Sequence, residues 1–590
     1  AAAEGQGCIR DGEGGAGADG WGSIWRVGRE GDGAIAELNS MEDTAIPPEL
    51  LLDEMLYSLM TFPNTTGLGW DKVHPRAMRR AHIQWLQALV KLLIRCEKEG
   101  RWPKTIELVI ICLLPKTDGG FRPIGLLPVL PRVWMRTRRN VTRAWERRND
   151  LSYMYAGKGK GAHVAAWQQS ARAEAAARFK AAYAQGLLDL VKAFERIQHW
   201  HLVQQAARLG YPRWLIRLSI ATYRMKRVLR IGDAISDVVQ ATRGITAGSG
   251  NATTEMRLEM IGIVDDALEQ EPTVEPTLYV DDLSAQCAGP DAYIVEHLVP
   301  FTQAVCDGIV AAGGEISATK SVCTATSPSL AHSIVTGLVQ HKIMPLIRAK
   351  SLGFGMAAGV RRNAKVINQR LKEYKARIPR FRMLRAMGVD TARLNRTGGT
   401  AALVWGQEAS GVPPSTLLQQ RQAVASTGSP ASGLGGQDID IALILQDGSA
   451  TGMADPAFVA HSGPLGHWAM AAWNGWRSTE SLGMMMQEAM IECDKAVHPW
   501  RIAYGPAAAT YLTAKRLGWT IVDATTWITD RGFQLNLLVD PPVVITRQVH
   551  DAVRRWRWRA ISLKFPSLAV LADGEGAIME PIWKLLRSTA

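Results

Sequence analysis

Acidic residues follow short apolar runs at two places in the chain. Asp189 comes directly after Leu187-Leu188, and the pair Asp281-Asp282 comes after Tyr279-Val280. Transfer of a phosphoryl or nucleotidyl group requires divalent cations that activate the attacking oxygen and neutralise the leaving group. Hard cations such as Mg²⁺ prefer carboxylate oxygens. One Asp at the end of a buried strand and an Asp pair at the tip of a neighbouring hairpin would supply these oxygens at one sheet edge.

The acidic pair by itself has a simpler explanation. Two adjacent aspartates usually lie at a turn in solvent, and short motifs match by chance. The chain contains a second such tripeptide, Val264-Asp265-Asp266, within a helical pattern where no chemistry is expected. The elements around Asp189 and Asp281 therefore have to decide between the two interpretations.

Strands and helices are expected to alternate around these acids. An apolar, β-branched run at 106–115 is followed by Thr117-Asp118-Gly119-Gly120, which predicts a hairpin. Apolar spacing then predicts a helix at 165–184, a buried strand at 187–191, a helix at 193–209, a hairpin at 227–244, a helix at 253–268, strands at 277–280 and 283–286, and a helix at 292–312. This order predicts an antiparallel sheet with helices on one face.

Composition narrows the class of protein. Lys and Arg number 68 and Asp and Glu 55, so the net charge of +13 favours a polyanionic partner. The seven cysteines form no C-x-x-C pair, which argues against a zinc finger or a disulfide framework. Apolar runs such as 108–114 are shorter than the roughly 20 residues of a membrane span, so no membrane partner is expected. A start without Met or a secretory leader indicates a piece of a longer open reading frame. The scattered cysteines, expected to be reduced thiols, indicate a nuclear or cytoplasmic compartment.

Six motifs together resemble those of reverse transcriptases of the non-LTR retrotransposon class, in the family's order, within residues 67–356. LDLVKAFE at 188–195 resembles the first-aspartate motif, commonly written D-L-x-K-A-F-D, and YVDD at 279–282 resembles the Y-x-D-D hairpin. RGITAGSG at 243–250 corresponds to the glycine loop. LPK at 114–116 with RPI at 122–124 resembles the fingers hairpin, ISATKS at 316–321 the palm lysine motif, and LGF at 352–354 the primer-grip strand.

This resemblance implies an α+β, right-hand polymerase fold, with fingers, an antiparallel palm sheet, a thumb and a mainly helical C-terminal region. The expected divisions are a disordered segment at 1–45, fingers at 46–160, palm at 161–355, thumb at 356–425, a linker at 426–437, and a helical connection domain of open role at 438–590. The implied activity is RNA-directed DNA polymerisation for a retrotransposon. Its partners would be an RNA template, a DNA primer and deoxynucleotides, with the oligomeric state left open.

The resemblance also implies roles for individual residues. Asp189 and Asp281 would bind two Mg²⁺ ions, for which Mn²⁺ could substitute, with the Leu190 carbonyl as a further ligand and Asp282 as a weaker third carboxylate. The expected nucleotide-binding residues are Lys116 and Arg122 at the phosphates, Phe194 against a ribose 2′-hydroxyl, Gly248 in the glycine loop, and Lys320 as an acid toward pyrophosphate. Without a role in nucleotide binding, Lys116, Arg122 and Lys320 would be solvent-exposed surface charges and Phe194 a core residue.

Arginine-rich segments at 132–148 and 361–385 are expected to bind nucleic acid phosphates. The residues chosen from them are Arg136, Arg138, Arg139, Lys365, Arg370 and Lys372. A third segment, RRWRWR at 554–559, is equally well explained by a helix packed on its tryptophans.

Several alternatives remain open at this stage. The family usually has Gln where Ala247 stands and Asp where Glu195 stands, which leaves template contact in question. Asp447, after an apolar run at 441–445 read as a strand, could begin a ribonuclease H site with Glu488, Asp523 and Asp530. An intron-maturase-like or domesticated reverse transcriptase, or an inactive nucleic-acid-binding relic, would also fit the motifs.

Overall fold

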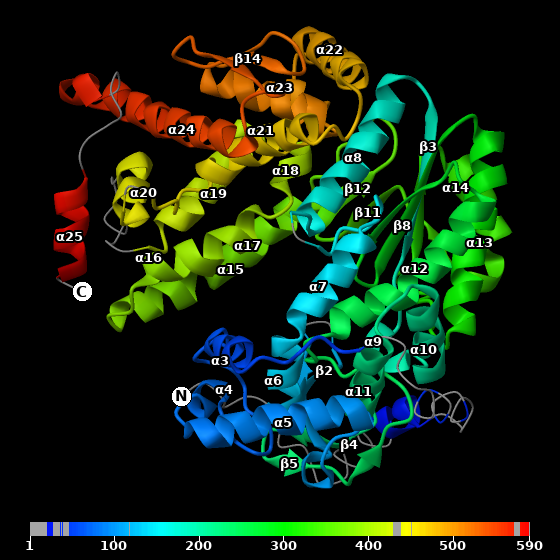
Figure 1. Ribbon diagram of the computed structural model, residues 1–590. Coiled ribbons are helices and arrows are strands. Elements are labelled where there is room, and N and C mark those ends of the chain that lie inside the picture. Colours follow the sequence, from blue (N-terminus) through cyan, green and yellow to red (C-terminus); the bar gives the residue numbers. More distant parts are fainter. Residues whose placement is uncertain are drawn as a thin grey trace. The chain divides into compact units, whose positions relative to one another are not determined.

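A computed structural model describes residues 20–26, 33, 36, 38, 46–116, 119–157, 159–428, 438–449, 451–571 and 579–588 (Figure 1). The chain divides into two compact units, each continuous in space but not in sequence. The first comprises residues 1–158, 188–283 and 300–321, and the second comprises residues 159–187, 284–299 and 322–590. Helix α13 (Asp291–Ala311) and strands β3 (Ala182–Leu188) and β8 (Asp282–Gly289) belong partly to each.

The first unit contains most of the residues predicted to form a site. Its helices are α3 (Leu52–Met60), α4 (Pro75–Met78), α5 (Ile83–Glu99), η1 (Lys104–Ile106), α6 (Val129–Thr137), α7 (Arg139–Arg148), α9 (Ala193–Arg196), α10 (His199–Arg208), α11 (Arg213–Tyr223) and α12 (Ala252–Gln270). Its strands are β1 (Leu108–Pro115), β2 (Phe121–Leu126), β4 (Lys226–Ile231), β5 (Ala234–Ile235), β6 (Val239–Gln240) and β7 (Glu275–Tyr279).

The predicted hairpins of the first unit are confirmed. Strands β1 and β2 pair antiparallel from Ile110↔Leu126 to Pro115↔Phe121, and β4 pairs antiparallel with both β5 and β6. Strand β1 also lies parallel to β4, which gives the order β2-β1-β4-β5. Side chains of β1 alternate between buried and half-buried along its first six residues, as a strand with one face on the core requires. The tip residues 117 and 118 lie outside the described residues.

The sheet that carries the aspartates is mixed, with the order β10-β9-β3-β8-β7. Strands β3 and β9 (Val322–Ala325) pair antiparallel from Ala184↔Ala325 to Leu187↔Val322, whereas β10 (Met344–Pro345) runs parallel to β9. The prediction of a wholly antiparallel sheet is therefore wrong at its β10 edge. Strands flank Asp281-Asp282 as predicted, whereas the strand before Asp189 spans Ala182–Leu188 rather than the predicted 187–191.

Two predicted helices end or break earlier than expected. The helix predicted at 165–184 is α8 (Ala162–Arg178), which ends where Lys180 adopts a left-handed φ of 56°. Alanines continue into β3, so composition did not mark the end of the helix. The helix predicted at 193–209 is divided into α9 and α10 by extended residues at Ile197 and Gln198.

The prediction of disorder at 1–45 is wrong for residues 20–26. Residues 20–25 form a helical segment, in which Trp21 and Trp25 are only 7% and 1% exposed. Burial of two indole rings offsets the ordering entropy that the surrounding glycines impose. Most of the remaining residues of this range lie outside the described part.

The second unit is mainly helical. Its helices are α8, α14 (Pro328–Gly337), η2 (Val339–His341), α15 (Lys365–Ala386), α16 (Thr391–Leu394), η3 (Asn395–Gly399), α17 (Thr400–Val404), α18 (Gln407–Ser410), α19 (Pro414–Ala425), α20 (Ile439–Asp447), α21 (Ala457–Trp473), α22 (Thr479–Lys495), η4 (Pro499–Arg501), α23 (Pro506–Leu517), α24 (Pro542–Lys564), η5 (Pro566–Leu571) and α25 (Glu580–Ser588). Its further strands are β11 (Arg348–Ser351), β12 (Phe354–Ala357), β13 (Thr520–Ile521), β14 (Thr526–Ile528) and β15 (Gln534–Asn536).

One core runs through the second unit, across the predicted boundary at 426–437. Trp167 of α8, Phe354 of β12 and Phe458 of α21 all belong to the same buried cluster. Glu174 of α8 accepts hydrogen bonds from the first amides of α23, at 2.6 Å from Ala507 and 3.1 Å from Ala508. Residues 438–590 therefore do not form a core of their own. Residues 429–437 of the predicted linker lie outside the described part.

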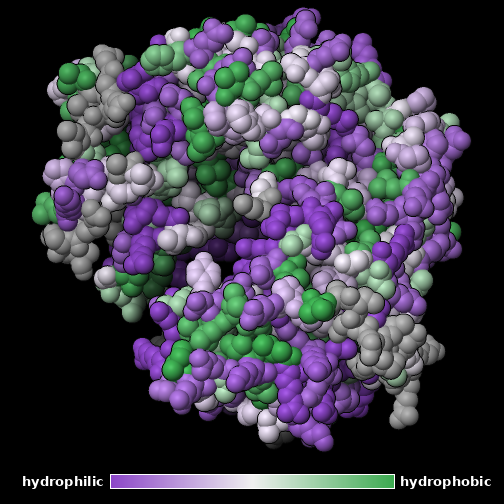
Figure 2. Space-filling model, viewed as in Figure 1, coloured by the Kyte–Doolittle hydropathy of each residue, from purple (hydrophilic) through white to green (hydrophobic). Residues whose placement is uncertain are grey.

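Apolar residues lie on an exposed helix face at α5 and at buried positions of α13. Hydrophobic residues gather over α5 on the face of the first unit seen in Figure 2, where Ile83, Trp85 and Ile94 are exposed. Among the described residues, α13 alone is long and apolar enough to cross a membrane, but its Phe301 and Val305 are fully buried in the protein. The six described cysteines are free thiols.

Candidate catalytic site

Asp189 lies just beyond the end of β3, in a loop whose backbone is held at both sides. Its amide donates to the hydroxyl of Ser321 at 3.1 Å, and its carbonyl accepts from the amide of Ser317 at 2.8 Å. A β-bridge joins Leu190 to Ile316, and the amide of Val191 donates to the carbonyl of Glu315 at 2.9 Å. The ISATKS segment thus fixes the Asp189 backbone, whereas the side chain of Lys320 in that segment is exposed.

Asp281 and Asp282 lie at the turn between β7 and β8. The preceding Val280 has a φ of 64°, in the left-handed region that β-branched residues rarely adopt. Such a conformation costs on the order of 1–3 kcal/mol and persists only where the surrounding structure enforces it. The turn leaves Asp281 half-buried and Asp282 exposed.

The three carboxylates lie within electrostatic range of one another. Burial raises the pKa of Asp281, the charge on Asp189 raises it further, and Arg122 opposes both effects. Partial desolvation, together with the charges on Asp281 and Asp189, raises the pKa of Asp282 to about 6, although this side chain faces solvent. Among the described residues, neither Asp281 nor Asp282 forms an ion pair. Bringing a cation to this place would relieve the repulsion between the acids.

The acids do not form a closed metal cage. In the described part of the chain, no group of three or more His, Cys, Asp or Glu side chains is arranged to hold a metal ion. Mg²⁺ usually keeps several waters and is bound through one or two carboxylates together with substrate phosphates. An open set of coupled carboxylates at a strand end and a neighbouring turn fits that kind of ion, and the Leu190 carbonyl lies on the same loop as Asp189.

A cation of the β1–β2 hairpin interacts electrostatically with these acids. Lys116 and Arg122 are exposed side chains near the open end of β1 and β2, and Arg122 lies close enough to lower the pKa of Asp281. Partial burial lowers the pKa of Lys192, and the positive charges of Arg196 and Lys116 lower it further. Lys192 was not predicted as a site residue, although it is the lysine of the K-A-F motif at 192–194. Arg122 of β2 thus interacts electrostatically with Asp281 of the β7–β8 turn, and Lys116, just after β1, with Lys192 of the Asp189 loop.

The glycine loop is wedged between β2 and α9. A side chain at Gly248, which has a φ of 115°, would place its Cβ 2.4 Å from the carbonyl oxygen of Gly125. The amide of Gly125 donates to the carbonyl of Ala247 at 2.5 Å. On the other side, a Cβ at Gly244 would lie 2.6 Å from the carbonyl oxygen of Glu195. Close backbone approach therefore requires glycine at 248; nucleotide binding by Gly248 remains a prediction.

Phe194 belongs to the Asp189 motif and contacts the glycine loop. Its carbonyl accepts from the amide of Ile245 at 2.7 Å, and its side chain is half-buried. A half-buried ring is compatible both with core packing and with a contact to a nucleotide sugar, so its selective role remains a prediction.

Three arginines of the segment at 132–148 were predicted to bind nucleic acid, and for Arg138 the prediction is wrong. Its guanidinium is 2% exposed and pairs with both carboxylate oxygens of Glu97 at 2.6 Å, beneath the ring of Trp214. A buried charge must be paired, and this pair leaves no donor face for phosphate. Arg136 is half-buried over the ring of Phe62, whereas Arg139 is exposed.

The prediction that Arg370 on α15 of the second unit binds nucleic acid is also wrong. It donates to the carbonyls of Ala402 and Gly353 at 3.2 and 3.1 Å, so it joins α15 to its neighbours. Lys365 and Lys372 are exposed on the same helix and remain candidates for phosphate contact.

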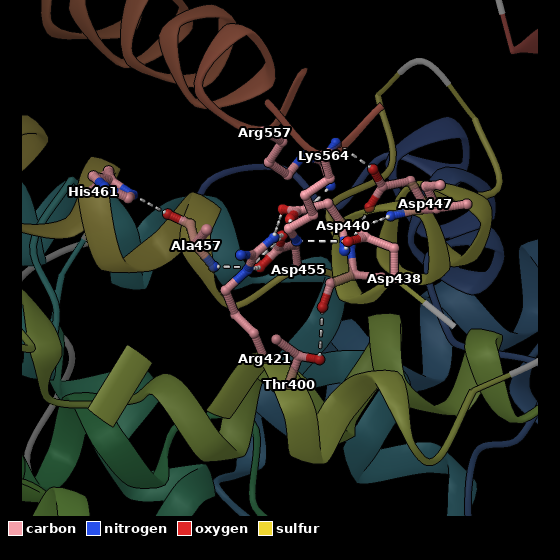
Figure 3. A network of polar contacts seen from close by, with 12 residues as sticks. Thr400, Arg421, Asp438, Asp440, Asp447, Asp455, Ala457, His461, Arg557 and Lys564 are labelled. Carbon is pink, nitrogen blue, oxygen red and sulfur yellow. Dashed lines mark hydrogen bonds and ion pairs between the residues drawn. The ribbon is translucent and has the colours of Figure 1, made fainter. Parts of the chain in front are cut away.

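The ribonuclease H alternative is wrong. The run at 441–445 belongs to helix α20 rather than to a strand, and Asp447 is buried against Arg557 at 2.8 Å (Figure 3). Asp455 and Asp440 pair with Arg421 in the same network, at 2.8 and 2.5 Å. Acids already neutralised by buried arginines are not available as metal ligands.

Two of the other acids of that alternative also have structural roles, whereas Glu488 is an exposed residue of α22. Asp523 accepts from the amides of Thr525 and Thr526, and Asp530 pairs with Arg555 at 2.7 Å. Because Arg555 and Arg557 are buried in these pairs, the RRWRWR segment is a packed helix.

No family model and no curated protein matches the chain. Among solved structures, an apo telomerase from Candida tropicalis truncated from its C-terminal domain aligns with 43% of this chain and 54% of its own, at 13% identity and a TM-score of 0.32. A telomerase from Candida albicans in complex with a fragment of telomeric RNA aligns with 70% of this chain and 67% of its own, at 11% identity and a TM-score of 0.36. The chain thus spans about half the length of the first of these proteins. Both scores are below 0.5, so the assignment of function depends on the site itself.

Proposed function

We propose that this protein is an RNA-directed DNA polymerase of the non-LTR retrotransposon type, which adds deoxynucleotides to the 3′-hydroxyl of a DNA primer on an RNA template. The observation that carries the proposal is the electrostatic coupling of Asp189, Asp281 and Asp282, from a strand end and a neighbouring turn, with Arg122 of the fingers hairpin opposite them. The order of the six sequence motifs supports the same assignment. A retrotransposon enzyme of this kind would act in a nuclear or cytoplasmic ribonucleoprotein.

Each residue of the site would have a separate role in nucleotidyl transfer. When bound, two Mg²⁺ ions would activate the primer hydroxyl and neutralise the developing charge on pyrophosphate. Asp189 and Asp281, with the Leu190 carbonyl, would hold them, and Asp282 would contribute a third, more exposed carboxylate. Arg122 and Lys116 would bind the triphosphate from the fingers side, and Lys192 adds a cation that the sequence alone did not single out. Lys320, exposed beside the Asp189 loop, would donate a proton to the leaving pyrophosphate.

Primer extension on an RNA template with Mg²⁺ tests this proposal. Asp281→Asn should lower kcat on the order of 1000-fold, because a lost metal ligand costs several kcal/mol and each 1.36 kcal/mol is a factor of ten. The chain supplies a matched control in Val264-Asp265-Asp266, where Asp266 pairs with Arg208 on the surface of α12. Asp266→Asn removes a charge from the same tripeptide and should leave the rate unchanged. Equal rates for Asp281→Asn and the unaltered chain would exclude the mechanism.

The proposal has two competitors. An intron-maturase-like or domesticated reverse transcriptase would show the same chemistry with a different template preference. A catalytically inactive relic would bind primer and template but extend neither. Retained coupling among three acids that repel one another disfavours the relic, because such an arrangement costs stability in the absence of a ligand.

A further inference from the structure

Residues 20–26 of the first unit contact the two loops that flank the proposed catalytic site. The carbonyl of Trp25 accepts from the amide of Thr242 at 2.9 Å and from its hydroxyl at 3.1 Å. The carbonyl of Ile24 accepts from Nε of Arg243 at 2.5 Å. These bonds join the helical segment to Thr242 and to Arg243, the first residue of the glycine loop.

The ring of Trp25 reaches the glycine loop through one buried arginine. Arg227 of β4 is 1% exposed, and its guanidinium carbon lies 4.7 Å from the centre of the Trp25 ring. Nη2 of Arg227 donates to the carbonyl of Gly244 at 3.0 Å and lies 3.5 Å from the hydroxyl of Thr246. Trp25 therefore covers the guanidinium that holds the first half of the loop.

The ring of Trp21 contacts the other loop. Nζ of Lys192 lies 4.0 Å from the centre of this ring, and Lys192 is three residues from Asp189. Trp21 and Trp25 are themselves adjacent, with ring centres 5.5 Å apart. Trp21 thus packs against the amine of Lys192 and Trp25 against the guanidinium of Arg227, so each tryptophan can hold its cation in place.

We propose that residues 20–26 are a positioning element for the polymerase site, in which Trp25 fixes the glycine loop through Arg227 and Trp21 fixes Lys192 beside Asp189. Neither tryptophan is placed against substrate. Their effect on catalysis rests on the proposed function, whereas their effect on the loop does not. Removing Trp25 should loosen residues 242–246 and thereby weaken the hold on the incoming nucleotide.

Two measurements on the full chain test this inference. Hydrogen exchange at the amides of Thr242, Gly244 and Ile245 should speed up at least tenfold in Trp25→Ala, because each of these amides is bonded in the docked arrangement. In single-nucleotide primer extension, the same variant should raise KM for the deoxynucleotide about tenfold with little change in kcat. Trp25→Phe keeps an aromatic face over Arg227 and should restore most of both properties. Trp21→Ala should raise KM without altering exchange at 242–246.

Trp102→Ala is the matched control, since Trp102 is 3% exposed in the same unit and donates to Thr222 rather than bonding residues 242–246. It should lower the melting temperature without changing KM or exchange at 242–246. Unchanged exchange in Trp25→Ala, or an equal increase in Trp102→Ala, would overturn the inference. An unchanged KM in an active Trp25→Ala protein would also overturn it. If the unaltered chain extends no primer, the proposed function fails, and exchange alone decides the positioning role.

Discussion

Replacing Gly248 with Ala tests whether close packing of the glycine loop on β2 sets the geometry of the site. The added Cβ would lie 2.4 Å from the carbonyl oxygen of Gly125, whereas ordinary contacts begin at 3.4 Å, so the loop or the strand must move by 1.0 Å. Both partners are backbone, and Gly125 is itself bonded to Ala247 at 2.5 Å, so neither can move alone. Displacement of a positioning element by about 1 Å can cost on the order of 100-fold in rate, which corresponds to about 2.7 kcal/mol.

The control for this substitution separates collision from backbone strain. Gly232, in the turn between β4 and β5, has a φ of 59° and open space where a Cβ would stand. Gly232→Ala should cost about 1–2 kcal/mol of stability from the left-handed conformation alone. It should leave kcat and KM unchanged.

Single-nucleotide primer extension gives kcat and KM for both variants, and thermal unfolding followed by circular dichroism gives their stabilities. Gly248→Ala should lose activity far beyond its loss of stability relative to Gly232→Ala. If both variants polymerise like the unaltered chain, contact with Gly125 does not position the loop and the reasoning is refuted.

Three further predictions follow from the same structure. At limiting Mg²⁺, kcat/KM should fall as the pH drops through about 6, because Asp282 must be ionised to bind a cation and only about one tenth would be ionised one pH unit below its pKa; a profile identical to that of Asp282→Asn would contradict this. Arg138→Met should cost about 3–5 kcal/mol of unfolding free energy by leaving Glu97 buried and unpaired, and Arg139→Met less than about 0.5 kcal/mol. Denaturant titration distinguishes the two, and a double variant with Glu97→Met should recover much of the loss. Phe194→Val should admit ribonucleotides in primer extension, and unchanged discrimination would show that the ring serves packing alone.

Sequence alone determined the local elements around the acids. The apolar runs at Asp189 and before Asp281 predicted strands near these acids, and the structure has strands at Glu275–Tyr279 and at Ala182–Leu188, the latter earlier than the predicted 187–191. The β1–β2 hairpin and the helix after the glycine loop were found in the same way. These features depend on side-chain periodicity and turn residues within a few positions of each other, which the sequence displays directly.

Tertiary structure decided which charged side chains are paired inside the protein and which are free to bind a ligand. Arg138 and Arg139 are neighbours in sequence, yet Arg138 is buried against Glu97, 41 residues earlier, while Arg139 is exposed. Asp447 stood in a plausible catalytic pattern, but its partner Arg557 lies 110 residues later and neutralises it. A charge that pairs inside the protein looks the same in sequence as one that faces solvent, because pairing depends on distant segments meeting in space.

The N-terminal tryptophans follow the same rule. Glycine-rich composition predicted disorder for this segment. The prediction failed because the surface that buries Trp21 and Trp25 is formed by distant residues, at 192, 227 and 242–243. Local composition fixed the turns and strands that carry the acids. Only the assembled fold supplied the neighbours that order this segment and separate a structural ion pair from a site, because desolvation and Coulomb energy depend on three-dimensional proximity.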